Sequence, residues 1–226
     1  MTNSTASERK LCSALLPIAL VMALVACSSN ATKHARTDSK TERSSSTAAA
    51  NEVFRGIDLN CVMDHIQNPP EAFHYSYHKQ SSNPVEEQAD ITPQTIDGSF
   101  KNSDVARPLH GVRSDPQSWQ TAWSGLMGIS GMSSTIAIIR SSSAITKEGP
   151  EKMNGYDATR LSIDTTKADP AEQGLYRAVL GQGGFEKGTA WVTSQGCPVK
   201  LVLDSEQHGN NGDVDKVHYE IAMVRK

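Results

Sequence analysis

The sequence has few of the features that identify nucleic-acid-binding or membrane-spanning proteins. Only 22 of its 226 residues are Lys or Arg, against 25 that are Asp or Glu, and aromatic residues make up 5%. Because no basic stripe is interleaved with aromatic residues, we do not expect nucleic-acid binding. The longest apolar run, Leu11 to Val25, has about fifteen residues, which is too short to span a bilayer comfortably.

The sequence also lacks the motifs of common catalytic and metal sites. Gly128 to Gly131 is one residue too short for the Gly-x-Ser-x-Gly turn of a hydrolase. The glycines at 181–184 lack the preceding strand and the lysine of a phosphate-binding loop. His74 and His78 share one face of an expected strand but lie about 13 Å apart along it, too far to chelate one ion. We therefore expect no enzymatic activity, no metal and no cofactor.

The N-terminal segment has the parts of a bacterial signal peptide in their usual order. Arg9 and Lys10 precede the apolar run, which ends in Leu24-Val25-Ala26-Cys27. This tetrapeptide resembles a lipobox, in which a small residue lets a peptidase cut before a cysteine that accepts a diacylglyceryl group. We predict a lipoprotein signal peptide over residues 1–26 and lipidation (with palmitate among the acyl chains) of Cys27. The alternative is a plain secretory signal.

Residues 27–50 are expected to form a disordered tether between the lipid and a folded domain. Fifteen of the 23 residues after Cys27 are Ser, Thr or Ala, so this segment cannot bury enough apolar surface to fold. Two or three acyl chains would anchor the chain stably on the extracytoplasmic side of the cell envelope. If the cell is Gram-negative, Ser28 favours the periplasmic face of the outer membrane over the inner membrane.

Residues 51–226 are enough for one domain with a sizeable core. The clearest signal is the strict alternation of Phe73 to His78, which predicts a half-buried strand, and Gln94 to Phe100 is its expected neighbour. Asp115 and the capping box Asp169-Pro-Ala-Glu172 are expected to start helices. The whole pattern predicts antiparallel strands over 73–78, 94–100, 154–164, 188–193, 199–204 and 216–224, and helices over 57–66, 115–139 (kinked near Gly128) and 169–180.

Two thiols remain in the expected mature domain, those of Cys61 and Cys197. An even pair in an oxidising compartment indicates one disulfide, which would tie the first helix to the last hairpin. The alternative is two unpaired residues, one buried on a helix and one exposed in a turn. The sequence leaves both open because it does not give the distance between the two residues.

Three short segments, Met153–Arg160, Lys187–Val192 and Gly196–Lys200, resemble a known group of lipoproteins. They contain an Asn-Gly turn before a central strand and a later hairpin of the form Gly-x-Ala-Trp-hydrophobic, turn, Gly-x-Pro-Val-Lys. This pattern is similar to the half-barrel lipid-carrier superfamily, which includes LolA, LolB and the mycobacterial LppX and LprG lipoproteins. The resemblance implies an α+β fold, in which a curved antiparallel sheet carries helices on its concave face around an apolar cavity for acyl chains.

We therefore expect a non-enzymatic lipoprotein that binds a lipid or another hydrophobic ligand in a carrier or chaperone role. The alternative is a structural or interaction lipoprotein with a filled core and no ligand, and a hydrolase is a third hypothesis. Core packing of a helix against a sheet explains Trp119, Trp123 and Met127 somewhat better than cavity lining does, and the two are compatible. Gly128 would let a ligand or another backbone come close. The expected lining residues are Phe73, Tyr75, Tyr77, Trp119, Trp123, Leu126, Met127, Trp191, Val199 and Leu201.

Replacing the expected lipidation site tests the anchor directly. We predict that Cys27→Ala yields a protein that no longer fractionates with membranes, because it has no thiol to accept the diacylglyceryl group and therefore no acyl chains to insert. Radiolabelled palmitate should enter the wild-type protein and not the variant. Equal labelling of both proteins would contradict the lipobox assignment.

Overall fold

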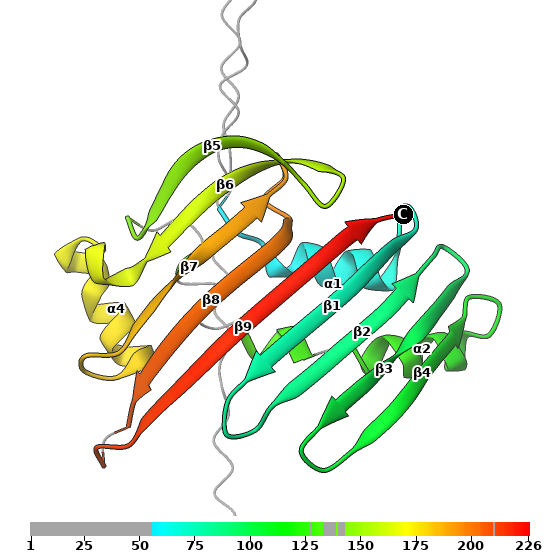
Figure 1. Cartoon of the computed structure of the whole chain (residues 1–226), viewed down its shortest axis with the longest axis horizontal. Coiled ribbons are helices and arrows are strands. Elements are labelled where there is room, and N and C mark those ends of the chain that lie inside the picture. Colours follow the sequence, from blue (N-terminus) through cyan, green and yellow to red (C-terminus); the bar gives the residue numbers. More distant parts are fainter. Residues whose placement is uncertain (1–55, 127, 133–138, 140–142, 210) are drawn as a thin grey trace, which may run out of the picture. The chain divides into compact units, whose positions relative to one another are not determined.

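The computed structural model describes residues 56–126, 128–132, 139, 143–209 and 211–226, which belong to one compact unit. Nine strands of this part form one open antiparallel sheet, in the order β4-β3-β2-β1-β9-β8-β7-β6-β5 (Figure 1). Every pairing joins strands that follow each other along the chain, except that between β1 and β9. The strands are β1 (Phe73–Gln80), β2 (Val85–Ile91), β3 (Thr95–Asn102), β4 (Ala106–Val112), β5 (Ile145–Met153), β6 (Tyr156–Asp164), β7 (Phe185–Val192), β8 (Pro198–His208) and β9 (Val214–Arg225).

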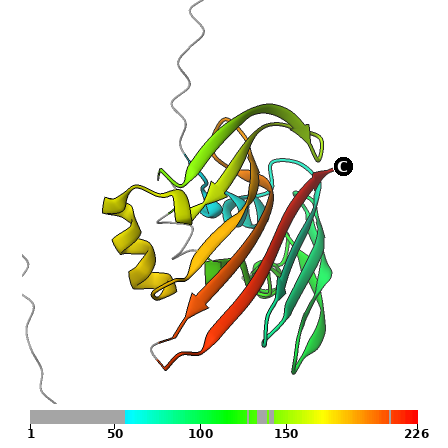
Figure 2. The same cartoon turned by 60° about the vertical axis from the view of Figure 1, so that its left-hand side comes forward.

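The described helices are short, and two of them begin at an aspartate cap that the sequence encodes. Asp58 accepts a hydrogen bond from the backbone N–H of Asn60, and Asp115 accepts from those of Gln117 and Ser118. Figures 1 and 2 show α1 and α2 on the same side of the sheet. None of the described helices is both long and apolar enough to cross a bilayer. They are α1 (Leu59–Gln67), α2 (Pro116–Ser124) and α4 (Pro170–Leu180), with short 3-10 helices η1 (Gly128–Met132) and η2 (Thr165–Lys167).

One face of the sheet carries the core and the other meets solvent. In β1, Phe73, Tyr75 and Tyr77 are at most 3% exposed, while the residues between them are more exposed. Their cross-strand partners continue the same face: Ala89 lies opposite Tyr75 on β2, and Ile221 lies opposite Tyr77 on β9. We call this buried side the inner face and the opposite side the outer face.

The predicted α+β class with an antiparallel sheet is confirmed, but several details of the prediction are wrong. β2 and β9 flank β1, so Gln94 to Phe100 is not its neighbour. The reason is that the chain turns back at once after Gln80 and forms β2. The segment 115–139, expected as one helix kinked or broken near Gly128, is broken before that glycine: α2 ends at Ser124 with Gly125 as its C-cap, and η1 follows over Gly128–Met132. Residues 133–138 of the expected helix lie outside the described residues.

The expected capping box at the start of α4 is also wrong. The side chain of Asp169 makes no cap hydrogen bond. Glu172 instead reaches a neighbouring segment, where its Oε2 accepts from the backbone N–H and the hydroxyl of Ser143, both at 2.9 Å. A tertiary contact has therefore replaced the local one.

The Cys61–Cys197 disulfide is confirmed, and the alternative of two unpaired thiols is excluded. It joins the first turn of α1 to the turn before β8 across a sequence separation of 136 residues. The backbone N–H of Asp58 donates to the carbonyl oxygen of Gly196 at 2.8 Å beside it. In the chain-entropy model, closing a loop of this length stabilises the fold by about 5 kcal/mol.

The sheet requires glycine at position 98, where β3 lies against β2. A Cβ atom on Gly98 would overlap the carbonyl oxygen of Gln88 and lie 2.7 Å from the Cβ of Ala89. We predict that Gly98→Ala lowers the free energy of unfolding by about 1–3 kcal/mol, as overpacking does elsewhere. Urea denaturation measures the change.

Gly174, inside helix α4, provides the matched control. A Cβ atom there would have no neighbour within 4 Å. Gly174→Ala should raise the free energy of unfolding by about 1 kcal/mol, because alanine favours a helix interior. If Gly98→Ala were as stable as the wild type, the close approach of β2 and β3 would be disproved.

Candidate functional site

Most of the predicted lining residues lie together in the core. The sheet contributes those on β1 and β8, and helix α2 with the residues after it contributes the others. Met127 lies outside the described residues. Those brought together are Phe73, Tyr75, Tyr77, Trp119, Leu126, Val199 and Leu201, each at most 6% exposed, with the half-buried Trp123 packed against the same cluster.

Trp191, also predicted to line the cavity, is half-buried and packs against the same cluster, but its strand frame differs from that of the buried Ala190 and Val192. It lies on the outer face, where its Nε1–H donates to Oε2 of Glu151 at 2.8 Å. The charged groups of Arg160 and Lys200 lie 5.6 and 5.3 Å from the centre of its ring. Cation–π contacts of this kind suit an aromatic side chain at the surface. The assignment of Trp191 to the cavity lining is therefore not supported.

Trp119 packs between elements rather than against an open space. Its Nε1–H donates to the backbone carbonyl oxygen of Gln67, the last residue of α1, at 3.2 Å. The guanidinium of Arg113 lies 4.6 Å from the centre of the ring and also donates to that carbonyl oxygen. Hydrogen bonds from Trp119 of α2 and from Arg113, which follows β4, thus connect both elements to the C-terminal end of α1.

Glu87 is a buried carboxylic acid on the inner face and is only 2% exposed. Its Oε1 accepts from the backbone N–H of Gly128 at 2.8 Å, and its Oε2 accepts from the hydroxyl of Tyr75 at 3.3 Å. Burial outweighs these two hydrogen bonds and raises the pKa of Glu87 to about 7. A Cβ atom on Gly128 would lie 2.5 Å from Oε1 of Glu87, so the group that approaches this glycine is the carboxyl group.

Glu186 on β7 is a second buried acid, only 1% exposed. Its backbone N–H donates to Oγ1 of Thr165 at 2.8 Å, and Ser205 lies opposite it on β8. Burial, offset in part by the Ser205 hydroxyl, raises the pKa of Glu186 to about 7. Its Oε2 has no hydrogen-bond partner among the described residues. The inner face thus holds two carboxyl groups that are mostly uncharged below pH 7.

Sequence reasoning missed both acids, although the alternation of their strands contains the signal. In β2, Val85, Glu87, Ala89 and Ile91 occupy one frame, so the glutamate stands where the apolar residues stand. In β7, Glu186 shares a frame with Ala190 and Val192, again among buried residues. Carboxylate side chains are rarely buried. A prediction from residue type alone therefore puts both glutamates on the solvent-facing side of the sheet.

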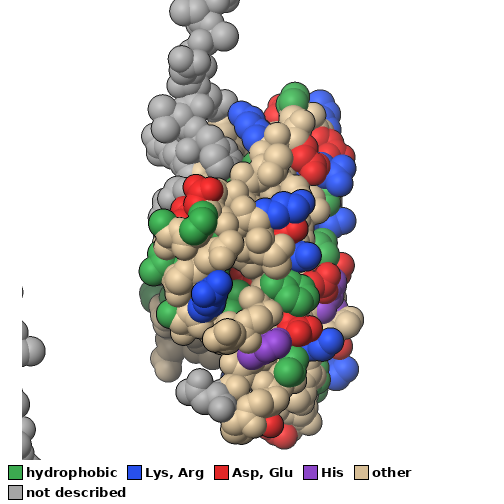
Figure 3. Space-filling view, turned by 90° about the vertical axis from the view of Figure 1, so that its left-hand side faces the viewer, with side chains coloured by type: hydrophobic (Ala, Val, Ile, Leu, Met, Phe, Trp, Pro, Cys, Tyr) green, Lys and Arg blue, Asp and Glu red, His purple; other side chains and the backbone are tan. Residues whose placement is uncertain are grey.

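The outer face carries ion pairs between neighbouring strands. Figure 3 shows charged and histidine side chains gathered along the side of the molecule that faces the reader in Figure 1. His74 pairs with Asp90 at 2.8 Å, and His218 pairs with Asp204 at 2.7 Å. Because acid and base are matched across the strands, this face presents a mixed charge rather than one sign.

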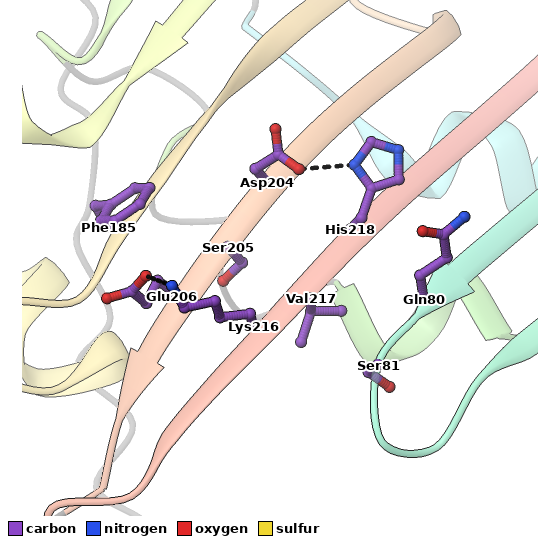
Figure 4. A pocket seen from close by; sticks show the side chains of 9 residues that line it. All are labelled: Gln80, Ser81, Phe185, Asp204, Ser205, Glu206, Lys216, Val217 and His218. Atoms are coloured by element: carbon purple, nitrogen blue, oxygen red, sulfur yellow. Dashed lines mark hydrogen bonds and ion pairs between the residues drawn. The ribbon is translucent and has the colours of Figure 1, made fainter.

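A shallow hollow of about 450 Å³ lies at the ends of β8 and β9 (Figure 4). The bond between His218 Nδ1 and Asp204 resembles the orienting half of a Ser-His-Asp triad. The other ring nitrogen, Nε2, lies 3.8 Å from Glu220, and Ser81 in the same hollow donates to the carbonyl oxygen of Asn83. The described residues therefore do not assemble a triad here.

Comparison of the chain with protein-family models and with curated proteins found no match in either. The resemblance to the half-barrel lipid carriers stays a prediction from sequence segments. The chemistry of the inner face is therefore the basis for inferring a function.

The two buried acids predict how stability depends on pH. Their pKa is about 7 in the folded chain against an ordinary value of 4.5, so the folded chain binds more protons between these values. Their contribution is fully present below pH 4.5 and is lost as the pH rises through 7. A shift of this size corresponds to about 3 kcal/mol for each acid. We predict that the free energy of unfolding falls between about pH 5 and 8, and that Glu87→Gln reduces the fall.

Urea denaturation at several pH values measures this dependence. Glu220→Gln is the matched control, because Glu220 is an exposed glutamate on the outer face. It should leave the slope of stability against pH unchanged. Equal slopes in the wild type and in Glu87→Gln would show that Glu87 does not titrate with a raised pKa.

Proposed function

We propose that the chain is a membrane-tethered lipoprotein, anchored through Cys27, that binds a lipid or another hydrophobic ligand at the inner face. The observation that carries this proposal is the chemistry of that face. A continuous apolar cluster extends from α1 to β9 and is interrupted by two buried carboxyl groups, one of which has an oxygen without a partner among the described residues. Ligand sites are typically apolar surfaces with a few placed polar groups.

The architecture is consistent with a half-barrel carrier. An open sheet of nine antiparallel strands, with α1 and α2 on one side, is the arrangement that the resemblance to the LolA, LolB, LppX and LprG lipoproteins implies. In our proposal the helices cover the concave face, and the ligand lies between them and the strands. The anchor holds this domain in the cell envelope, outside the cytoplasm.

A filled-core lipoprotein without ligand is the second candidate, and two contacts favour it. The carboxyl group of Glu87 occupies the space beside Gly128, and Trp119 closes the gap between α1 and α2. Both contacts lie at the α2 side of the core. The unpartnered oxygen of Glu186 lies on β7 instead, so we place the ligand on the β7–β8 side of the inner face.

Co-purified lipid tests the proposal. The full chain with Cys27→Ser carries no anchor lipid, so any lipid that remains bound is a ligand. Native mass spectrometry should show a mass increment above the protein, and organic extraction should release the bound molecule. The purified protein should also take up a fluorescent fatty acid. If neither extraction nor uptake detects a ligand, the filled-core candidate is correct.

Two substitutions separate the faces of the sheet. Leu201→Trp adds volume on β8 within the inner face and should weaken fatty-acid uptake by about tenfold, or about 1.4 kcal/mol. Trp191→Ala removes an aromatic side chain of the outer face and should leave uptake unchanged. Overpacking costs about 1–3 kcal/mol of stability, so uptake is measured well below the melting temperature of each variant. Equal loss in both variants would argue against a site on the inner face.

A further inference from the structure

The disulfide has a histidine beside it. His65 lies one turn after Cys61 on α1, and its Nδ1 is 3.4 Å from Sγ of Cys61 and 3.9 Å from Sγ of Cys197. The three donor atoms lie within 4.8 Å of one another. Among the described residues, Cys61, His65 and Cys197 form the one group of at least three His, Cys, Asp or Glu side chains whose donor atoms lie this close together.

Solvent reaches this group through a surface hollow. The hollow holds about 390 Å³, and His65, Cys197 and Thr193 contribute to its wall. Cys61 and His65 are half-buried, while Cys197 is buried beneath them. Glu71 and Arg225 line the same hollow but pair with each other at 2.8 Å. A small thiol or a metal ion can therefore approach the sulfur atoms from this side.

We propose that reduction of the Cys61–Cys197 disulfide creates a binding site for a thiophilic divalent ion such as Zn²⁺. An external dithiol supplies two electrons and two protons, becomes a disulfide itself, and leaves two cysteine thiols. The ion then displaces both thiol protons and binds the two thiolates and Nδ1 of His65. Two thiolates balance the charge of the ion, so the loaded site is neutral in its half-buried setting.

The position of His65 suits this ligand set, while the two sulfur atoms, bonded to each other now, must move apart to about 3.8 Å once the disulfide is reduced. Zn–S bonds of about 2.3 Å and Zn–N bonds of about 2.0–2.1 Å at tetrahedral angles place N and S about 3.5 Å apart. The two nitrogen–sulfur distances, 3.4 and 3.9 Å, already bracket this value. Three protein ligands leave the fourth tetrahedral position open to water.

Two local features act on the site in opposite directions. Cys61 lies in the first turn of α1, where the helix N-terminus stabilises a thiolate. His65 Nδ1 now lies 2.7 Å from the carbonyl oxygen of Cys61. To bind the ion it must give up this contact and carry its proton on Nε2. A small rotation of the ring is enough for this, because His65 lies one helix turn after Cys61 and its Nδ1 is already beside both sulfur atoms.

Zinc titration of the reduced chain tests the proposal. All forms carry Cys12→Ser and Cys27→Ser, so that Cys61 and Cys197 are the thiols present. Competition with a chromogenic chelator should show one Zn²⁺ per reduced chain and none per oxidised chain. His65→Ala should weaken binding by at least about tenfold, since even the loss of an outer-shell partner has an effect of this size. His74→Ala, on the outer face, is the control and should bind as the parent does.

Circular dichroism keeps the test decisive if reduction loosens the fold. In that case Zn²⁺ should restore the native spectrum in the parent and in His74→Ala, and should do so poorly in His65→Ala. Co²⁺ in place of Zn²⁺ should give thiolate charge-transfer absorption in the reduced parent. The proposal is overturned if the reduced chain binds no Zn²⁺ and regains no structure with it, or if His65→Ala binds as tightly as the parent.

Discussion

The pairing of β1 with β9 is the interaction on which the rest of the sheet depends. It joins the strands β1 to β4 to the strands β5 to β9, and within each of these two groups every strand pairs with its neighbour in the chain. The register runs from Phe73 opposite Arg225 to Gln80 opposite His218, so it closes most of the folded chain into one loop. Such a pairing carries a large loop-closure entropy. The Cys61–Cys197 disulfide closes an overlapping loop covalently, from α1 to the turn before β8, and so brings the strand that pairs with β9 close to α1 and β1.

The sequence predicts the inner strands of this sheet better than its edges. Phe73 to His78 alternates because one face is buried and the other is solvated, and the C-terminal strands show the same period. The edge strands β4 and β5 were missed because each has a partner on one side only and contains a proline, Pro108 or Pro150. Proline is tolerated at sheet edges, yet in a sequence it argues against a strand. β2 was not predicted either, and the segment Gln94 to Phe100 was therefore expected beside β1 in its place.

Prediction of the candidate site failed where residue type and position disagree. Trp191 was assigned to the cavity because it is large and aromatic, although Lys187 and Thr189 in the same alternating frame already indicate the outer face. Glu87 and Glu186 were passed over for the opposite reason, since they are acidic residues in buried frames. The apolar residues that follow both rules, such as Tyr75 and Leu201, are buried on the inner face. Strand parity was the better guide in each case.

The buried acids also bear on the choice between a ligand site and a filled core. A buried polar atom without a partner costs about 1–3 kcal/mol, and Glu186 has one such oxygen among the described residues. Ionisation of either buried acid lowers stability further above pH 7. A core whose only task is packing would be more stable with an apolar side chain at this position. A polar group on a bound molecule would instead satisfy the free oxygen, so Glu186 is the residue at which the ligand hypothesis explains more than the filled core does.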